Sequence, residues 1–386
     1  MLKFASYLTL SMALISCTPL QQFQIPLRES GAAQDSLMKW QASLQVMLDQ
    51  AVNEHKLIGV QLSVKLPNGT IWNGASGTID LDRHQLMTPE HVIRMGSLTK
   101  TYTAVIAFRL VERGVLALDS TIDQWLPEYH QAHRVTLRML LNHSSGITDL
   151  LGMRVMFISS MNSSKLWTTS ELLDMIFGED LDFEPGTDNR YSNSNYVLLG
   201  IIAERATGKS LQTLYHDEIY IPLSLTNTYF LPSDLIPAEL VTSYDRSLIP
   251  LPGWHSADPD NTAWSSCAHA SGGMAANASD VLRFFDSIMN REIITETSYN
   301  AMTQFTKANN PKDKYLENFG LGLFHYGNFY EGAYGHLGLF IGSEAIAIFL
   351  PEKKFVLVFL ANVSRIDNSD AIIKKFLDVI LGHNGT

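Results

Sequence analysis

The chain has 386 residues, of which 46% are apolar and 17% are charged, and its formal net charge is −11. A chain of this length can bury a sizeable core. Its acidic balance, without a basic run, excludes nucleic-acid binding by electrostatic attraction.

The N-terminus predicts a lipoprotein signal peptide over residues 1–16. Lys3 precedes an apolar run that is too short to cross a bilayer and that ends in Leu-Ile-Ser-Cys. This ending resembles a bacterial lipobox, so we expect Cys17 to carry lipid and to be the first mature residue. An ordinary signal peptide with an incidental cysteine is the alternative. Lipidation would leave Cys267 alone, and no intramolecular disulfide could then form.

Residues 17–35 are rich in Pro, Gln and Gly and predict a flexible tether. Because Thr18 rather than aspartate follows the cysteine, we expect a periplasmic protein anchored to the outer membrane, by analogy with other lipoproteins. The membrane is then a partner through the lipid, and residues 36–382 are the expected folded domain. No later segment is long enough to be transmembrane.

The domain is predicted to begin with a helix and a strand hairpin. Ser36 is typical of a helix N-cap, so the Ser-x-x-Lys sequence that it forms with Lys39 is interpreted as part of an amphipathic helix. Residues Ile58–Lys65 and Thr70–Ala75 flank Pro-Asn-Gly and predict two antiparallel strands.

A second Ser-x-x-Lys sequence has a different context. Residues i and i+3 share a helix face with Cβ atoms about 5–6 Å apart, so the amine of Lys100 can lean over the hydroxyl of Ser97. Gly96 lets the backbone turn tightly before the serine. An apolar run follows and predicts a buried helix that ends at Gly114. The serine is therefore expected at a helix N-terminus, where its backbone N–H can face an anion.

Tyr191 precedes another apolar run, which predicts a second buried helix ending at Gly208. A hydroxyl, a lysine one turn later and a distant tyrosine form a nucleophile with two candidate bases. The sequence leaves open whether Lys100 or Tyr191 accepts the proton of Ser97.

Other polar motifs are interpreted as structural. The Tyr-x-Asn sequence at Tyr326 lies in a stretch rich in glycine and aromatic residues, which is typical of a turn. His130 and His133 lack a carboxylate and a third histidine at zinc-site spacing, so we predict no metal and no cofactor. Cys267 is expected to be a small packed residue rather than a catalytic thiol.

The C-terminal part predicts strands at Leu339–Leu350 and Phe355–Val363 and a helix at about 369–381. Strands at both chain ends indicate an α+β fold with one antiparallel sheet flanked by helices and formed by both termini. Residues of about 101–265 form an inserted, mainly helical region, and the groove beside the sheet is the expected site. The proline-rich stretch 231–265 is interpreted either as a loop over this pocket or as ordered packing on the surface.

These segments resemble the serine β-lactamase-related family, which includes class C β-lactamases, D-alanyl-D-alanine carboxypeptidases and esterase relatives. The likeness covers about residues 36–380 and is greatest to the Streptomyces-type secreted carboxypeptidase. The matching stretches are 94–100, 140–147, 184–186, 191–196, 221–228, 271–274 and 335–338. The fold implied is that of the β-lactamases and transpeptidases.

The resemblance implies a chemistry for the first two motifs. Ser97 would attack a carbonyl to form an acyl-enzyme that water or another acceptor resolves, and Lys100 and Tyr191 would share the proton transfers. Asn193 would hydrogen-bond both the substrate amide and Lys100.

The third motif implies the other substrate contacts. His336 would lie on the edge strand, where many relatives have lysine, and it is followed by Gly338 and Leu339. The backbone N–H groups of Ser97 and Leu339 would form the oxyanion hole.

Two departures from the family pattern limit the substrate. Leucines occupy positions 337 and 339, where similar carboxypeptidases have threonines, and no arginine occurs between Arg291 and Arg365. The usual carboxylate clamp is thus expected to be absent, unless His325 or Lys307 replaces it from a loop. An unpaired buried carboxylate is unfavourable.

We therefore predict a cell-envelope serine hydrolase that cleaves an ester, amide or D-amino-acid peptide bond in a small-molecule or peptide substrate. Activity on β-lactams and on peptides ending in free D-alanine is expected to be weak. The alternatives are a D-alanyl-D-alanine carboxypeptidase or β-lactamase proper, and a non-catalytic lipid-anchored binding or scaffold protein.

Overall fold

The computed structural model describes residues 31–82, 84–245, 255–257, 262–309, 316–327 and 332–381, and the chain divides into two units, 1–40 and 41–386. The predicted signal peptide and Cys17 lie outside the described residues. Helix α1 spans Gly31–Glu54 and so begins inside the predicted tether. The alanines and glutamine after Gly31 favour helix, which explains the earlier start.

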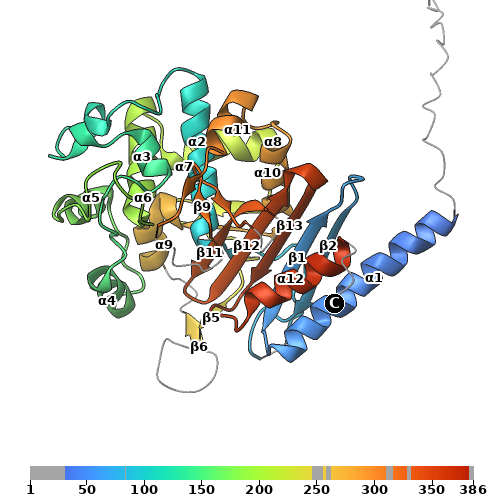
Figure 1. The fold of residues 1–386 in the computed structure, drawn as a ribbon. Helices are drawn as coiled ribbons and strands as arrows, with labels where there is room; N and C mark the ends of the chain where they lie inside the picture. Colours follow the sequence, from blue (N-terminus) through green and yellow to red (C-terminus); the bar gives the residue numbers. More distant parts are fainter. Residues whose placement is uncertain are drawn as a thin grey trace, which may run out of the picture. The chain divides into compact units, whose positions relative to one another are not determined.

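The second unit is built on one eight-stranded sheet with the order β2-β1-β13-β12-β11-β10-β9-β8 (Figure 1). Every neighbouring pair is antiparallel. The strands are β1 (Gly59–Lys65), β2 (Ile71–Gly77), β8 (Thr306–Lys307), β9 (Asn318–Phe319), β10 (Phe324–His325), β11 (Tyr334–Phe340), β12 (Ser343–Leu350) and β13 (Phe355–Ala361). β1 pairs directly with β13, so the prediction that both chain ends form one sheet is confirmed.

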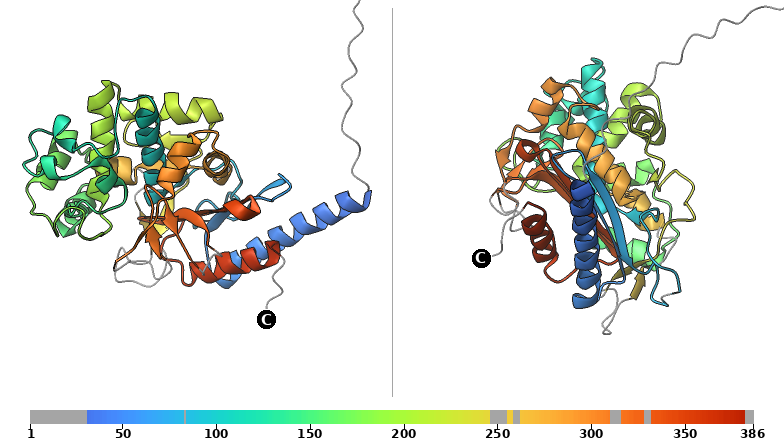
Figure 2. Two further views of the ribbon diagram at one scale, coloured as in Figure 1. Left: turned by 45° about the horizontal axis from the view of Figure 1, so that its top comes forward. Right: turned by 90° about the vertical axis from the view of Figure 1, so that its right-hand side faces the viewer.

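Helices cover both faces of this sheet (Figure 2). α10 (Ala278–Met289) packs against β1, β12 and β13, with Phe285 facing Phe349 at 6.4 Å between ring centroids. α12 (Ser369–Ile380) lies on the other face beside the part of α1 that follows Trp40. β13 is buried along its whole length because both of its faces are covered.

Two strand predictions need correction. The predicted strand 339–350 is divided by a turn at Gly342, whose φ is +85°, so that β11 ends at Phe340 and β12 begins at Ser343. β11 also lies between β12 and β10 rather than at the edge of the sheet, so the edge position predicted for His336 is wrong. The strands beyond β11 have only two residues each, too few to show an alternating pattern.

The middle of the chain is mainly helical, as predicted. Its described helices are α2 (Thr99–Glu112), α3 (Leu137–Leu141), α4 (Met153–Met161), α5 (Thr169–Phe177), α6 (Asn193–Thr207), α7 (Leu211–Tyr215), α8 (Ile221–Leu223) and α9 (Thr262–Ala268), and α11 (Glu296–Met302) follows α10. α2 is followed by Gly114 and α6 by Gly208, both with positive φ, which is the predicted glycine ending.

Short strands connect the helical region to the sheet. β3 (Ile93–Arg94), β7 (Met274–Ala276) and β4 (Thr228–Phe230) form a small sheet, and β5 (Ser243–Asp245) pairs with β6 (His255–Ala257). Residues 246–254 and 258–261 of the predicted loop 231–265 lie outside the described residues, and its described part includes β5, β6 and the start of α9. Within the described part of the chain, no helix has the length and apolar character that crossing a membrane requires.

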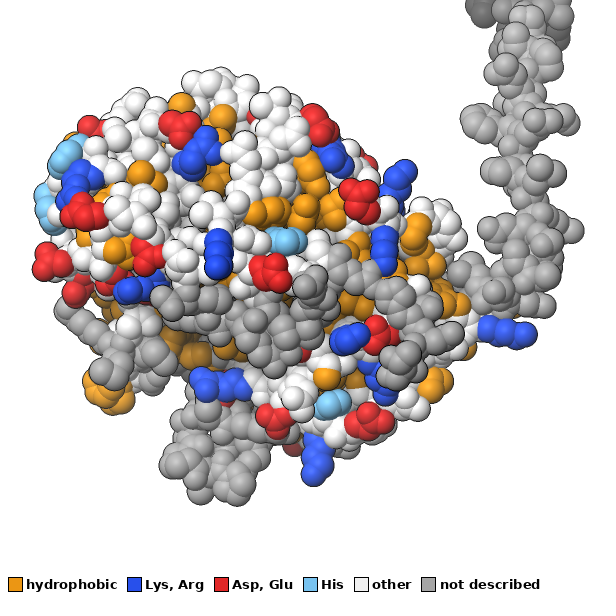
Figure 3. Space-filling model, viewed as in Figure 1, with side chains coloured by type: hydrophobic (Ala, Val, Ile, Leu, Met, Phe, Trp, Pro, Cys, Tyr) orange, Lys and Arg blue, Asp and Glu red, His pale blue; other side chains and the backbone are white. Residues whose placement is uncertain are grey.

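On the face of the molecule that Figure 3 shows, basic side chains lie singly among acidic ones. This mixture fits the net negative charge of the chain.

Candidate active site

The candidate nucleophile lies in a single 3-10 turn, Gly96–Leu98, directly before α2. Gly96 has φ +51°, and a Cβ built there would lie 2.6 Å from the carbonyl oxygen of Leu339. Only glycine tolerates this backbone and this close approach. The glycine therefore lets β11 lie directly against the turn that carries Ser97.

Two proton-carrying groups converge on the hydroxyl of Ser97. Lys100 Nζ donates to Ser97 Oγ at 3.1 Å, and the Tyr191 hydroxyl donates to the same oxygen at 2.7 Å. Lys100 is fully buried and also donates to Asn193 Oδ1 and to the carbonyl oxygen of Ser271, both at 2.7 Å. The start of α6 and the residues before β7 thus meet α2 at the amine of Lys100.

Burial is the main reason that the pKa of Tyr191 lies well above its usual range, and the nearby charge of Asp149 raises it further, against the lowering effect of the hydrogen bond with Ser97. The phenol therefore keeps its proton near neutral pH. The ring of His143 packs 4.6 Å from the Tyr191 ring, and His143 Nδ1 accepts the backbone N–H of Ser192 at 3.3 Å. His143 thus braces Tyr191 rather than reaching Ser97.

Asn193 is held by a residue that sequence reasoning missed. Its Nδ2 lies 3.1 Å from both carboxylate oxygens of Asp149, and its backbone N–H donates to Asp149 Oδ1 at 3.2 Å. These bonds fix Asn193 Oδ1 as the atom that faces Lys100. The side-chain nitrogen of Asn193 thus faces Asp149, a strong acceptor because it is a carboxylate.

Asp149→Asn is expected to move the rising limb of the pH profile for kcat/KM to lower pH by about 0.5–1 unit. The substitution removes a negative charge beside Asn193, which also bonds Lys100, and so favours the neutral amine of Lys100, while an amide oxygen at position 149 can still accept from Asn193. The matched control is Asp188→Asn, which removes an exposed carboxylate bonded to Asn309. A profile that Asp149→Asn and Asp188→Asn leave equally unchanged would contradict this role.

His336 is buried and uncharged near neutral pH. Its ring stacks on Phe324 at 3.9 Å between centroids, and its Nδ1 lies 2.6 Å from the carbonyl oxygen of Leu337. Burial, and secondarily the charge of Lys100, lowers the pKa of His336 to about 3. The position where many relatives have lysine thus adds no positive charge here.

Gly338 and Leu339 bring β11 to the nucleophile. A Cβ built on Gly338 would lie 1.8 Å from the carbonyl oxygen of Met95, so any side chain there would separate the strand from the 3-10 turn. Leu339 is 55% exposed and lines a cavity of about 150 Å³ that Ser97 and Asn193 also line.

The sequence places this arrangement in a known family. A family model described as Beta-lactamase matches residues 44–377. The chain belongs to the beta-lactamase family.

Relatives of this beta-lactamase-family chain include hydrolases of several kinds. Esterase EstB of Burkholderia gladioli is 30% identical over 278 residues, which cover 64% of this chain and 69% of the esterase. Penicillin-binding protein 4* of Bacillus subtilis is 24% identical over 350 residues, covering 88% of this chain and 76% of that protein. A crystal structure of D-amino acid amidase from Ochrobactrum anthropi, complexed with L-phenylalanine amide, is 27% identical with a TM-score of 0.77, covering 89% of this chain and 98% of the amidase. The predicted family and fold are confirmed, and the chain is a serine hydrolase of this family.

The cavity is also lined by a cation that the sequence analysis did not assign to the site. Arg365 lines it together with Asp245, and Arg365 Nε lies 3.7 Å from Asp245 Oδ2. An arginine at the end of the segment 291–365 thus lines the cavity, because the chain after β13 returns to it. Lys307 lines a different hollow, and His325 packs between Phe305 and Tyr334, so neither lines the cavity beside Ser97.

The remaining candidates do not join the site. Burial raises the pKa of Cys267 to about 12, so its thiol is not a ready nucleophile. Within the described ranges, no group of three or more histidine, cysteine, aspartate or glutamate side chains could hold a metal ion. Tyr326 is buried with its ring 6.2 Å from that of Phe324, while the groups bonded to Ser97 Oγ belong to Lys100 and Tyr191. Asn328 lies outside the described residues.

Proposed function

We propose that this protein hydrolyses esters, amides or D-amino-acid peptides through an acyl-enzyme on Ser97. The observation that carries the proposal is the position of Ser97 Oγ, within 3.1 Å of Lys100 Nζ and 2.7 Å of the Tyr191 hydroxyl. Ser97 Oγ attacks the substrate carbonyl carbon, and its proton passes to the neutral amine of Lys100. The backbone N–H groups of Ser97 and Leu339 receive the oxyanion.

The tetrahedral intermediate then expels an alcohol or an amine. Tyr191 keeps its proton near neutral pH because its pKa is raised, so it acts as a proton donor rather than as the base. Tyr191 gives its proton to the leaving group, and the ammonium of Lys100 returns a proton to the Tyr191 oxygen, so that Lys100 is neutral again. Water attacks the acyl carbon next and loses its proton to Lys100, which passes the proton to Ser97 Oγ as the acid leaves.

The walls of the cavity favour a substrate without a free carboxylate. Leu151, Trp264 and Leu339 present apolar surface to it, and Leu339 replaces a hydroxyl of the similar carboxypeptidases. The position of Arg365 in the cavity lining favours the alternative function, a carboxypeptidase or β-lactamase. However, the guanidinium of Arg365 already faces the buried carboxylate of Asp245. A substrate carboxylate would have to compete with Asp245. The relatives named esterase and D-amino acid amidase support the uncharged substrates.

A substrate panel tests this proposal. We expect kcat/KM for p-nitrophenyl butyrate or D-phenylalanine amide to exceed that for benzylpenicillin and for a peptide ending in D-alanyl-D-alanine by at least about 10-fold, since an imperfectly paired carboxylate is unfavourable by more than about 1.4 kcal/mol. Arg365→Gln should leave kcat/KM for the ester within about twofold of the wild-type value. Faster turnover of benzylpenicillin or of the D-alanyl peptide than of the ester would overturn the proposal.

A scaffold protein without catalysis is less consistent with the site, because Ser97 Oγ is hydrogen-bonded by both Lys100 and Tyr191.

We also propose that the enzyme is periplasmic and lipid-anchored at Cys17, as the N-terminal sequence predicts. The mass of the mature N-terminal peptide would test the anchor, since an unmodified residue 17 contradicts it.

A further inference from the structure

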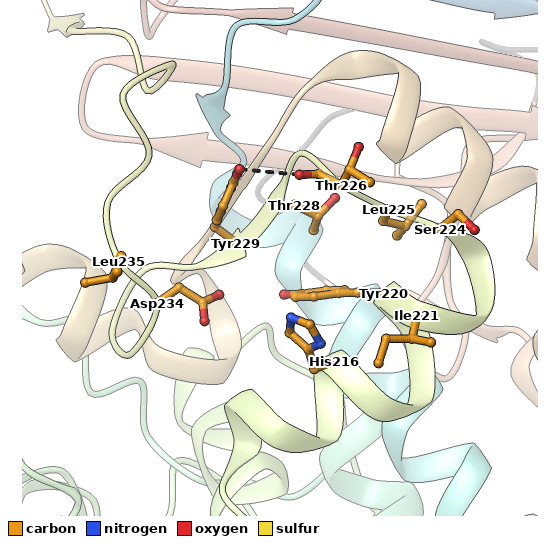
Figure 4. Close-up of a pocket in the computed structure, with 10 residues that line it drawn as sticks. All are labelled: His216, Tyr220, Ile221, Ser224, Leu225, Thr226, Thr228, Tyr229, Asp234 and Leu235. Atoms are coloured by element: carbon orange, nitrogen blue, oxygen red, sulfur yellow. Dashed lines mark hydrogen bonds between the residues drawn. The ribbon is translucent and has the colours of Figure 1, made fainter. Parts of the chain in front are cut away.

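A second hollow, of about 600 Å³, lies apart from the Ser97 cavity and shares no lining residue with it among the described residues. Its volume is within the range of ligand pockets. Figure 4 shows side chains from the α7–α8 segment on one side and from β4 and the residues after it on the other. The lining residues that matter below are His216, Tyr220, Ile221, Tyr229, Asp234 and Leu235.

One wall of the hollow is formed by a π-helical turn, η4, at His216–Tyr220. Such turns are rare and occur frequently at functional sites. The turn places both of its end residues in the lining. The ring of Tyr220 stacks on Tyr215 at 6.2 Å and meets the His216 ring edge-on at 5.5 Å, so its direction is fixed.

The hydroxyl of Tyr220 is buried and has no hydrogen-bond partner within the described part of the chain, although the residue is only 3% exposed. Figure 4 shows this hydroxyl directed into the hollow, toward the side where Asp234 lies. Burial raises the pKa of Tyr220, and the charge of Asp234 contributes to the shift. A buried polar group without a partner is unfavourable, so a ligand that pairs with it would bind more tightly.

The charge of the hollow indicates the sign of the ligand. Asp234 is fixed by the backbone N–H of Phe230 and by Gln212 Nε2, both at 2.5 Å, and no lysine or arginine is among the described residues that line this hollow. The rim is apolar, because Ile221 is 64% and Leu235 is 92% exposed. A carboxylate, an aromatic hydroxyl and an apolar rim together suit an organic cation.

We infer that this hollow binds a small primary ammonium ion that carries an apolar tail. The ammonium group would donate to the carboxylate of Asp234 and to the oxygen of Tyr220, and the tail would cover Ile221 and Leu235. The hollow is then a ligand site separate from the site of hydrolysis.

The test titrates 2-phenylethylammonium into the full protein by calorimetry, with 2-phenylethanol as the neutral control of the same shape. We expect saturable binding of the amine and at least about 10-fold weaker binding of the alcohol, since charge-assisted hydrogen bonds are lost. Tyr220→Phe and Asp234→Asn should each weaken amine binding by about 10-fold. Asp217→Asn is the matched control, because Asp217 is exposed in the same turn, pairs with Lys209 and does not line the hollow.

Two further readouts distinguish binding in this hollow from unfolding and from binding beside Ser97. Tyr220→Phe should keep or raise the thermal midpoint, because it removes an unpaired buried hydroxyl, so weaker binding would not reflect unfolding. Protein whose Ser97 has been blocked by a phosphonate should bind the amine as well as free protein does. Equal affinity for amine and alcohol, normal binding by Tyr220→Phe, or loss of binding in the blocked protein would each overturn the inference.

Discussion

Lys100→Arg is expected to slow acylation of Ser97 by about 10²–10⁴-fold, the usual contribution of a positioned base. Arginine keeps the positive charge but does not release a proton in proteins, so it cannot accept the proton of Ser97. The effect should be large because Lys100 supplies the amine in contact with Ser97 Oγ at 3.1 Å. The measurement is the rate of phosphonate labelling followed by intact mass.

Two variants make this result specific. Lys100→Met removes the amine without the added bulk of arginine and should be slowed to a similar degree. Tyr191→Phe should be slowed less, by about 10–100-fold, because it removes a donor but leaves the base. Labelling of Lys100→Arg within tenfold of the wild-type rate, with Tyr191→Phe inactive, would assign the base to Tyr191 and reject our mechanism.

Gly338→Ala is expected to reduce acylation by about 10²–10³-fold, the cost of losing one oxyanion donor. The added Cβ would lie 1.8 Å from the carbonyl oxygen of Met95, so β11 must move away from the turn that carries Ser97. That movement displaces the backbone N–H of Leu339. Overpacking should also lower the free energy of unfolding by about 1–3 kcal/mol, which urea titration measures.

Gly114→Ala is the matched control for this loss. Gly114 has φ +70°, so alanine is strained there, but a Cβ meets no atom within 4 Å. We expect destabilisation of about 1 kcal/mol with unchanged acylation. If folded Gly338→Ala labels at the rate of Gly114→Ala, the contact between β11 and the turn does not position the oxyanion hole.

Local features of the site were predictable from sequence because they depend on residues close in the chain. The spacing of Ser97 and Lys100 places both on one helix face, and Gly114 ends that helix as expected. The N-terminal hairpin was equally predictable, since Pro-Asn-Gly lies between two strand-forming segments. The convergence of Tyr191 on Ser97 rested on the family resemblance, because spacing alone does not pair residues 94 positions apart.

What the sequence did not reveal depends on tertiary packing. Asp149 is 44 positions from Asn193, and no pattern of residue types marks it as the partner of that amide. Arg365 reaches the cavity only because the chain turns after β13 with a φ of +58° at this residue. Gly342 did carry a local signal for the turn between β11 and β12, but the apolar run around it favoured one long strand.

The central claim is that Ser97 is acylated with the help of Lys100 and Tyr191. The most direct test is intact-mass analysis after incubation with a fluorophosphonate, for the wild-type protein and for Ser97→Ala. We predict a single adduct on the wild type, located at Ser97 by peptide mapping, and none on Ser97→Ala. An unlabelled wild type, or a variant that is labelled as fast as the wild type, would contradict the account.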